Sequence, residues 1–117
     1  MIGKRFVNND MLLLSTVGRI SGKSHTVPLL YLCDGEEYAV VASWGGRDDH
    51  PEWYLNLQIE PRATVQIRER RIPVRAATAD SQRRTLVWPR VLAAYEGYGT
   101  YQSRTERQIP VVILTPR

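Results

Sequence analysis

Residues 11–42 read MLLLSTVGRISGKSHTVPLLYLCDGEEYAVVA, and this stretch decides the fold. Three apolar runs rich in β-branched and aromatic residues follow one another in it, at 11–17, 26–33 and 37–42. A glycine-bounded turn at 18–23 separates the first two runs, and the hairpin signal Asp34-Gly35 separates the last two. The pattern therefore predicts three antiparallel strands joined by tight turns.

Two segments further along the chain are typical of short helices. Pro51 suits the first position of a helix over 51–58, and the next proline in the sequence ends that helix. Asp80 is a suitable N-cap for a second helix from Ser81 to about Tyr95, which Pro89 must kink or split.

Three further strands complete the pattern. Residues 63–67 and 72–76 alternate apolar and polar side chains, and the charged residues 68–71 between them predict an exposed hairpin tip. The apolar run 110–114 is flanked by prolines, which predicts a strand at a sheet edge. About six mostly antiparallel strands with two or three short helices make a mainly β (α+β) chain, a small closed or partly closed barrel.

The chain length and the order of the elements restrict the organisation further. With 117 residues the chain is expected to form one domain, 1–117. Strands and helices do not alternate, and no Gly-x-Gly-x-x-Gly follows a strand. A Rossmann-type dinucleotide site is therefore disfavoured.

The charge balance favours an anionic partner. The net charge is +4, and 14 of the 16 cations are Arg, whose guanidinium fork matches carboxylate and phosphate oxygens. A nucleic-acid-binding face built from Arg68, Arg70, Arg71 and Arg75 is one interpretation. Alternating Arg on a hairpin is more often a solvated face, so nucleic acid is not the expected partner. The charge balance alone leaves an anionic membrane face and an acidic cofactor open.

The single cysteine and the hydropathy pattern bear on the compartment. Cys33 has no partner for an intramolecular disulfide, which fits a reducing, cytoplasmic setting. No apolar stretch approaches the ~20 residues that span a bilayer, and residues 1–5 lack the apolar run of a secretory signal. We therefore expect no membrane contact. The sequence does not distinguish a monomer from a homodimer.

Three groups of residues could take part in ligand binding or catalysis. The turn 18–23 can present backbone N–H groups and cationic side chains to an anion, although an ordinary glycine-rich turn has the same pattern. The glycine loop 43–46 leads to the N-terminus of the first helix, where a flat heterocycle with an anionic tail could lie. Tyr95, Tyr98 and Tyr101 are either an aromatic lid or aromatic anchors of a loop.

The usual catalytic groups are scarce. His25 and His50 are not spaced as metal ligands, and no Gly-x-Ser-x-Gly elbow or paired carboxylate motif is present. This points away from hydrolysis and from a metal site. It favours a bound cofactor that supplies the reactivity while the protein supplies the orientation.

Taken together, these residues resemble the deazaflavin-dependent nitroreductase family, the F420-binding branch of the split β-barrel flavoproteins. The resemblance covers about Leu12 to Pro116 and rests on short motifs in a fixed order. The motifs are Leu12-Leu13-Leu14, Gly18-Arg19-x-Ser21-Gly22, Pro28-Leu29, Asp34-Gly35, Ala42-Ser43-x-Gly45-Gly46, His50-Pro51-x-Trp53-Tyr54-x-Asn56-Leu57, Glu60-Pro61, Tyr101-Gln102-Ser103 and Arg107-Gln108-Ile109-Pro110-Val111-Val112.

The resemblance implies a split β-barrel that binds coenzyme F420, an 8-hydroxy-5-deazaflavin with an oligoglutamate tail. It implies hydride transfer to a small organic acceptor such as a quinone, a nitroaromatic or an activated conjugated compound. By the same resemblance, the cofactor-binding residues are Gly18, Arg19, Ser21, Gly22, Lys23, His25, Pro28, Ala42, Ser43, Trp44, Gly45, Trp53, Tyr54 and Asn56. Tyr95, Tyr98 and Tyr101 match positions that border the acceptor, and Tyr98, Tyr101 and Ser43 are the candidate catalytic hydroxyls.

Three positions depart from the family pattern. Members usually carry a cation where this chain has Ile20, His25 and Trp44, and Lys23 and Arg47 are close enough in sequence to compensate in part. Each lost charge-assisted hydrogen bond could cost ~1.5–3 kcal/mol if it is not replaced. A split barrel that binds FMN or another ligand without F420-dependent activity is therefore the alternative.

Overall fold

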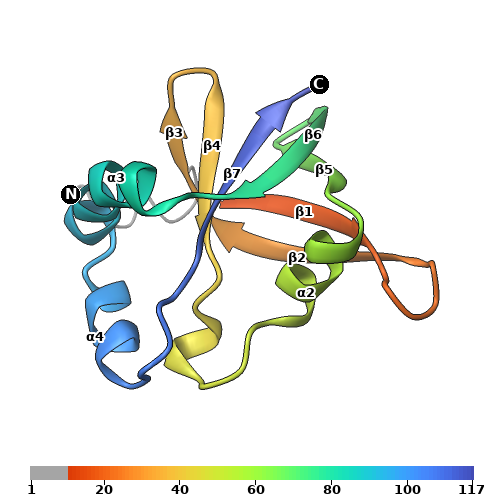
Figure 1. Cartoon of the computed structure of the whole chain (residues 1–117). Helices are drawn as coiled ribbons and strands as arrows, with labels where there is room; N and C mark the ends of the chain where they lie inside the picture. Colours follow the sequence, from red (N-terminus) through yellow and green to blue (C-terminus); the bar gives the residue numbers. More distant parts are fainter. Residues whose placement is uncertain (1–10) are drawn as a thin grey trace.

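Seven strands form one sheet in the computed structural model, which describes residues 11–117 (Figure 1). The strands are β1 (Met11–Val17), β2 (Ser24–Leu30), β3 (Leu32–Asp34), β4 (Glu37–Val41), β5 (Arg62–Ile67), β6 (Arg70–Thr78) and β7 (Val111–Pro116). Their order across the sheet is β2-β1-β5-β6-β7-β4-β3, and every neighbouring pair is antiparallel. The predicted class, a mainly antiparallel β fold with short helices, is confirmed.

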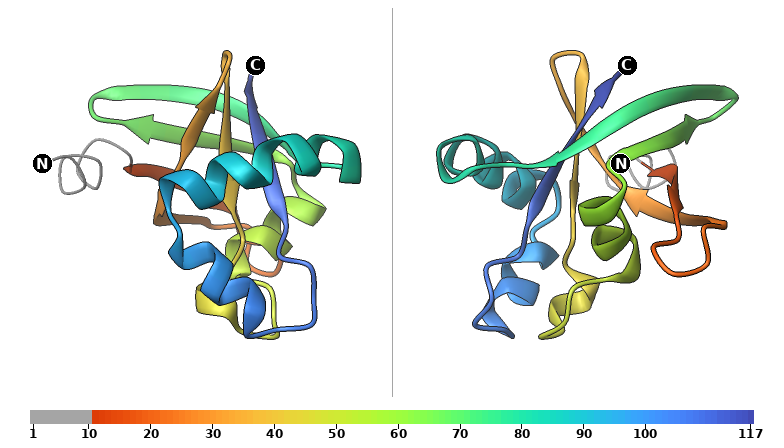
Figure 2. Two further views of the ribbon diagram at one scale, coloured as in Figure 1. Left: turned by 90° about the vertical axis from the view of Figure 1, so that its left-hand side faces the viewer. Right: turned by 45° about the vertical axis from the view of Figure 1, so that its right-hand side comes forward.

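The two end strands of this sheet are consecutive in the chain. The apolar run predicted as one strand, 26–33, is two strands that part at Tyr31: β2 pairs with β1, and β3 pairs with β4. Because one residue joins the two ends of the sheet order, the sheet has to curl back toward itself, as Figure 2 shows. The result is a barrel that stays split between β2 and β3.

Two apolar cores lie on the two faces of β4 and β7. Val112 and Leu114 belong to the core inside the curled sheet, whereas Val111 and Ile113 belong to a second core beneath the helices. β7 pairs with β6 on one side and with β4 on the other, so the prediction of an edge strand was wrong. The flanking prolines are tolerated because Pro110 precedes β7 and Pro116 is its last residue.

Within residues 11–117, one short 3₁₀ turn and three α-helices cover the ends of the sheet. They are η1 (Trp44–Gly46), α2 (Glu52–Ile59), α3 (Ser81–Ala94) and α4 (Gly97–Ser103). The Asp80 side chain accepts a hydrogen bond from the Arg83 backbone N–H at 2.8 Å, as its predicted role as N-cap requires. α3 continues through Pro89 without being split. α4 and η1 lie side by side below the sheet (Figures 1 and 2).

Candidate functional site

Two adjoining hollows lie where the β1–β2 hairpin, α2 and α4 approach one another. The apolar hollow, of about 580 Å³, is lined by β2, the loop after β4, the start of α2 and the tyrosines around α4. The turn hollow, of about 450 Å³, lies between the β1–β2 turn and α2. Val27, Glu52 and Trp53 line both hollows, so the two hollows adjoin along these three residues.

Most of the residues predicted for the site line one of these hollows. The apolar hollow collects Pro28, Ser43, Trp44, Gly45, Trp53, Tyr95, Tyr98 and Tyr101. The turn hollow collects Gly18, Arg19, Ser21, His25, Trp53 and Asn56. The predicted cofactor-binding residues are thus divided between the two adjoining hollows.

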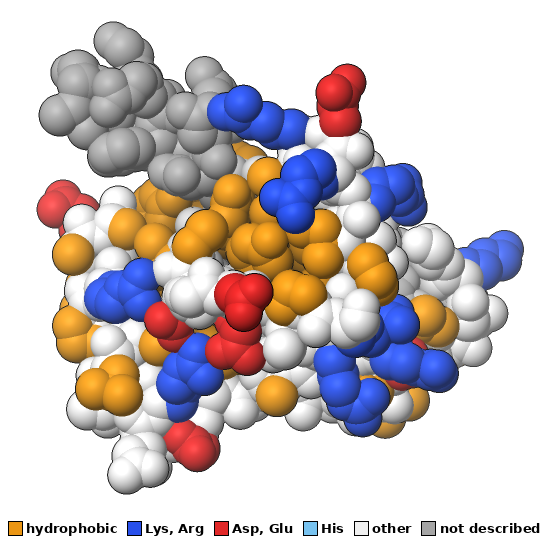
Figure 3. All heavy atoms as spheres, turned by 90° about the horizontal axis from the view of Figure 1, so that it is seen from above, with side chains coloured by type: hydrophobic (Ala, Val, Ile, Leu, Met, Phe, Trp, Pro, Cys, Tyr) orange, Lys and Arg blue, Asp and Glu red, His pale blue; other side chains and the backbone are white. Residues whose placement is uncertain are grey.

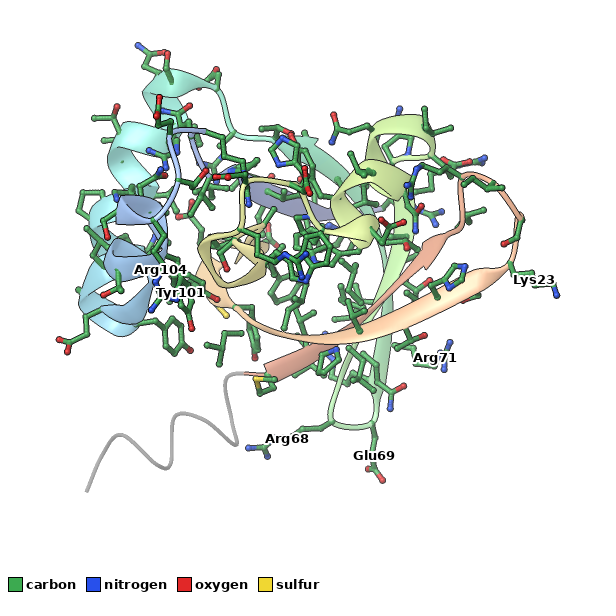
Figure 4. The ribbon with its side chains drawn as sticks, turned by 90° about the horizontal axis from the view of Figure 1, so that it is seen from below. Lys23, Arg68, Glu69, Arg71, Tyr101 and Arg104 are labelled. Atoms are coloured by element: carbon green, nitrogen blue, oxygen red, sulfur yellow. The ribbon has the colours of Figure 1, made fainter. Side chains whose placement is uncertain are left out.

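Four of the predicted residues line neither hollow. Gly22 has a φ of 76° at the tip of the β1–β2 turn, and the neighbouring Lys23 side chain points away from the body of the molecule (Figure 4). Ala42 is fully buried in the inner core. The Tyr54 hydroxyl lies 2.9 Å from Thr78 Oγ1, and its ring packs in the same core. Gly22, Ala42 and Tyr54 thus shape or support the site from outside.

Arg19 is held in place by two residues of α2. Its Nη1 and its backbone N–H donate to Asn56 Oδ1 at 2.8 and 3.2 Å, and its Nη2 lies 3.0 Å from Glu52 Oε1. Asn56 is only 4% exposed, and its Nδ2 donates to Thr16 Oγ1 at 3.1 Å. The buried amide is therefore fully paired, as expected for a costly buried polar group, and it fixes the guanidinium at the wall of the turn hollow.

Gly18 and His25 face each other across the β1–β2 turn. A Cβ at Gly18 would lie 2.7 Å from His25 Nε2, closer than side chains tolerate. Two backbone hydrogen bonds close the turn. The Gly18 N–H donates to Lys23 O, and the Gly22 N–H donates to Gly18 O. Glycine at this position thus lets the imidazole lie against the turn and line the hollow.

The loop after β4 makes a left-handed turn at the mouth of the apolar hollow. Trp44, Gly45 and Gly46 have φ values of 45°, 64° and 82°, and Trp44 is a non-glycine residue in a region that is rarely populated. Gly46 lies directly against α4, because a Cβ there would be 2.5 Å from Tyr101 O. The guanidinium of Arg47 stacks 4.1 Å from the centre of the Trp44 ring.

The three tyrosines form an edge-to-face ladder along the other wall. The ring centres of Tyr95 and Tyr98 are 6.1 Å apart, and those of Tyr98 and Tyr101 are 5.8 Å apart. Tyr98 and Tyr101 also pack on the second core, as the anchor interpretation expects, and the lid interpretation stays a prediction. Burial, together with the neighbouring Tyr101, raises the pKa of Tyr98 to about 12.

Several residues that line the two hollows were not predicted from the sequence. Met11, Leu29, Leu30 and Val41 line the apolar hollow, and Glu52 lines both hollows. The apolar side chains carry no signal beyond an ordinary strand pattern. Glu52 stands inside the quoted His-Pro-x-Trp-Tyr motif, and its position beside Trp53 on the first turn of α2 was the available signal.

Two kinds of feature are absent from the described residues. Within residues 11–117 no group of three or more His, Cys, Asp and Glu side chains is arranged to hold a metal ion. In the same part of the chain, no helix combines the length and apolarity needed to cross a membrane. On the face seen from above, an apolar area lies near the centre, basic side chains gather mainly on the right, and acidic and basic side chains are mixed on the left (Figure 3).

The split barrel thus has an apolar hollow beside a second hollow walled by Arg19 and His25, and these two hollows form the candidate site. The family model of the F420H(2)-dependent quinone reductases matches residues 1–116. The chain belongs to this family.

Individual relatives agree with this assignment. A Mycobacterium tuberculosis protein named as an F420H(2)-dependent quinone reductase is 47% identical over 106 residues, covering 91% of this chain and 89% of the relative. A second M. tuberculosis protein of that name is 38% identical over 112 residues, covering 91% of this chain and 73% of the relative.

Solved structures share the fold. An F420-H2 dependent reductase has a TM-score of 0.82 at 37% identity, over 90% of this chain and 93% of that structure. A structure described as a domain-swapped dimer has a TM-score of 0.83 at 37% identity, over 90% of this chain and 79% of that structure. A haem storage protein from Vibrio cholerae, at 16% identity and a TM-score of 0.66, shares the fold alone.

Proposed function

We propose that this protein is an F420-dependent reductase that transfers a hydride to a quinone or a comparable small organic acceptor. The observation that carries the proposal is the pair of connected hollows, one apolar and one walled by cationic and hydroxyl side chains, in a member of this family. A volume of about 580 Å³ is in the range that encloses a heteroaromatic ring system. The FMN-binding alternative has no comparable support.

The donor set fits the cofactor's acidic tail. Arg19, Ser21 and His25 line the turn hollow, where they would hold phosphate and carboxylate oxygens. Ser43, Gly45 and Trp53 would border the deazaflavin ring in the apolar hollow. Trp53 lines both spaces and would mark the passage from the ring to the tail.

The chain's own residues would orient the acceptor and keep water away from it. When bound, the reduced deazaflavin supplies the hydride. The apolar walls exclude water, and the tyrosine ladder sets the distance of approach for the acceptor. A phenol whose pKa is raised to about 12 stays protonated at neutral pH, so Tyr98 would donate a hydrogen bond to the oxygen that gains charge.

The structure also bears on the three departures from the family pattern. Ile20 is 89% exposed at the rim of the turn hollow, where it offers no hydrogen bond to an anion. Arg47 stacks on Trp44, so a cation remains beside that position. Lys23 points away from the molecule (Figure 4). We therefore expect tail binding to depend on Arg19 and His25 more than on Lys23.

A fluorescence titration tests the proposed function. F420 should bind saturably at micromolar concentration or below and more tightly than FMN. An Arg19→Gln variant should lose about tenfold in affinity, because one charge-assisted hydrogen bond to the tail is removed. A Lys23→Gln variant, which loses the same charge, is the matched control and should bind as the parent does. Equal affinity for F420 and FMN, or no binding of F420, would refute the proposal.

Oligomeric state and compartment are secondary proposals. We propose a homodimer, which the domain-swapped dimer among the similar structures supports, and light scattering during gel filtration would distinguish it from a monomer. We propose the cytoplasm as the compartment, because the exposed thiol of Cys33 is free and suits a reducing setting. Fractionation of the source cells tests that placement.

A further inference from the structure

Two segments outside the sheet form facing walls of the apolar hollow. One is the loop after β4, with Ser43, Trp44 and Gly45, and the other is the region of α4, with its three tyrosines. The loop that follows α4 contacts the first segment directly: Thr105 Oγ1 donates to Asp48 Oδ1 at 2.8 Å. The geometry of the hollow therefore depends on how these two segments are held together.

The side chain of Arg107 makes most of the hydrogen bonds between them. Its Nη2 donates to the carbonyls of Ser43 at 2.9 Å and Ala42 at 3.2 Å, and its Nε donates to the carbonyl of Arg47 at 2.8 Å. Its Nη1 lies 3.0 Å from His50 Nδ1. One guanidinium thus reaches four residues of the loop 42–50.

Arg107 is itself fixed and is not engaged by an acid. Gln102 Nε2 donates to the carbonyl of Arg107 at 2.7 Å, and the backbone N–H of Arg107 donates to Thr105 Oγ1 at 3.3 Å. Among residues 11–117 no carboxylate forms an ion pair with this guanidinium. Its donors are therefore directed at the loop carbonyls.

The turn that these bonds hold is one that the backbone would not adopt readily. Trp44 has a φ of 45°, and the Ser43 carbonyl accepts both from the Gly46 N–H at 2.9 Å and from Arg107. A bulky residue in the left-handed region persists only where its surroundings hold it there. The contacts from Arg107 supply that restraint at the residues that border the ligand.

We propose that Arg107 is the positioning residue of the apolar hollow, fixing the Ser43–Gly45 wall against the tyrosine wall and requiring a neutral His50 to complete its hydrogen bonds. The role of this wall toward a cofactor rests on the proposed function, whereas its restraint by Arg107 does not. Arg107 acts through the loop and not by contact with the ligand.

The part played by His50 makes the restraint pH-dependent. Burial, and then the charge of Arg107, lower the pKa of His50 from its ordinary value of 6.5, whereas Asp49 opposes this shift. The ring of Tyr54 on α2 packs against the imidazole at 4.8 Å between ring centres. As the pH falls below 6.5, protonation turns the acceptor Nδ1 into a donor that faces a guanidinium, so the restraint should weaken.

Hydrogen exchange of an Arg107→Gln variant tests the proposal without any ligand. We expect the amides of Gly46 and Arg47 to exchange about tenfold faster than in the parent protein, while amides of β4 keep their rates. Arg71→Gln, at the β5–β6 hairpin far from the loop, removes the same charge and is the control (Figure 4). Unchanged exchange at Gly46 and Arg47 would overturn the proposal.

Ligand measurements on the same variant give a second readout. Arg107→Gln should weaken F420 binding about fivefold and lower kcat more than it raises the acceptor KM, because a displaced wall misplaces the ring. If this variant does not fold, Arg107→Lys can replace it, because lysine keeps the charge but lacks the several donors of the guanidinium. It should weaken F420 binding and lower kcat to a smaller extent. Parent-like values for a folded variant would contradict the proposal. No F420 binding by the parent would refute the proposed function while leaving the exchange result to decide on Arg107.

The pH profile tests the contribution of His50. In the parent protein the dissociation constant for F420 should rise as the pH falls below 6.5, and a His50→Asn variant should lose that dependence, since the amide keeps an acceptor near the Nδ1 position. An identical acid dependence in both proteins, or none in the parent, would remove His50 from the proposal.

Discussion

Asn56 shows how much of the site is support for the groups that would contact a ligand. Its single side chain holds the β1–β2 turn to α2, because it accepts twice from Arg19 and donates to Thr16. The motif Trp-Tyr-x-Asn singled out this residue, and the structure places it in the wall of the turn hollow. What the motif could not show is that the amide acts on Arg19 and that Tyr54 lies in the core.

Replacing this amide tests its supporting role. Asn56→Leu should destabilise the protein by about 2–3 kcal/mol, because it leaves the part-buried donors of Arg19 and the buried Thr16 hydroxyl without their Asn56 partner. Thermal or denaturant unfolding measures the change. Gln58→Leu makes the same substitution at an exposed position of α2 and should change stability by less than about 0.5 kcal/mol. Equal effects of the two changes would count against this role for Asn56.

The hydroxyl of Tyr98 has a prediction of its own. Because its pKa is raised to about 12, it should serve as a hydrogen-bond donor across the neutral range. Tyr98→Phe should therefore lower turnover about tenfold at every pH between about 6 and 9, with F420 affinity nearly unchanged. Tyr38→Phe, on β4 and outside the hollows, is a suitable control. A loss of turnover confined to one end of the pH range would show a titrating role instead.

For the secondary-structure elements, the sequence pattern located most of the strands but did not predict which strands pair with one another. Periodicity placed strands at 11–17, 37–42 and 63–67, where the structure has β1, β4 and β5 to within a residue. It read 26–33 as one strand because apolarity continues through Tyr31, and no local signal marks the change of partner there. Pairing between distant segments is set by tertiary packing, which also explains why β7 lies inside the sheet.

The contact between η1 and α4 has the same long-range character. Nothing in the local sequence shows that Gly46 meets the backbone of Tyr101 or that Arg107 reaches the loop after β4. Gly46→Ala should destabilise the protein by about 2 kcal/mol or more, since it combines a φ of 82° with a contact of 2.5 Å to Tyr101 O. Gly45 also has a positive φ, but the space around it is open. Gly45→Ala should therefore lower the free energy of unfolding by less than Gly46→Ala does. Equal losses would show that the contact with α4 contributes nothing.

For the molecule as a whole, one ionic network joins the β3–β4 hairpin to α3. Arg83 Nη2 lies 2.6 Å from Asp34 Oδ2 and 2.9 Å from Glu37 Oε1, and Arg90 Nη1 lies 3.0 Å from Asp34 Oδ1. The hydrogen bond from Arg83 lowers the pKa of Asp34, and bonds from Thr115 and then Arg83 lower the pKa of Glu37. Both carboxylates are thus favoured in their charged form by folding.

The pH dependence of stability follows from these directions. The contribution of the two carboxylates is fully present above their ordinary pKa values of 3.8 and 4.5, and it is lost as the pH falls through the lowered values. The melting temperature of the parent should therefore fall more steeply below about pH 4.5 than that of Arg83→Gln. Arg70→Gln, on β6, should keep the steep dependence of the parent. Parallel curves for Arg83→Gln and the parent would exclude the network as the cause.

Tyr31 is the only residue between β2 and β3, the first and last strands in the sheet order. A slip of β2 by one position along β1 could not be absorbed by a connecting loop, and it would pull β3 out of line with β4. The one-residue connection thus couples the register of β2 on β1 to the register of β3 on β4, so neither pair can reach its final register independently of the other. Because the two ends meet only after the long-range pairs have formed, closure of the barrel should come late in folding.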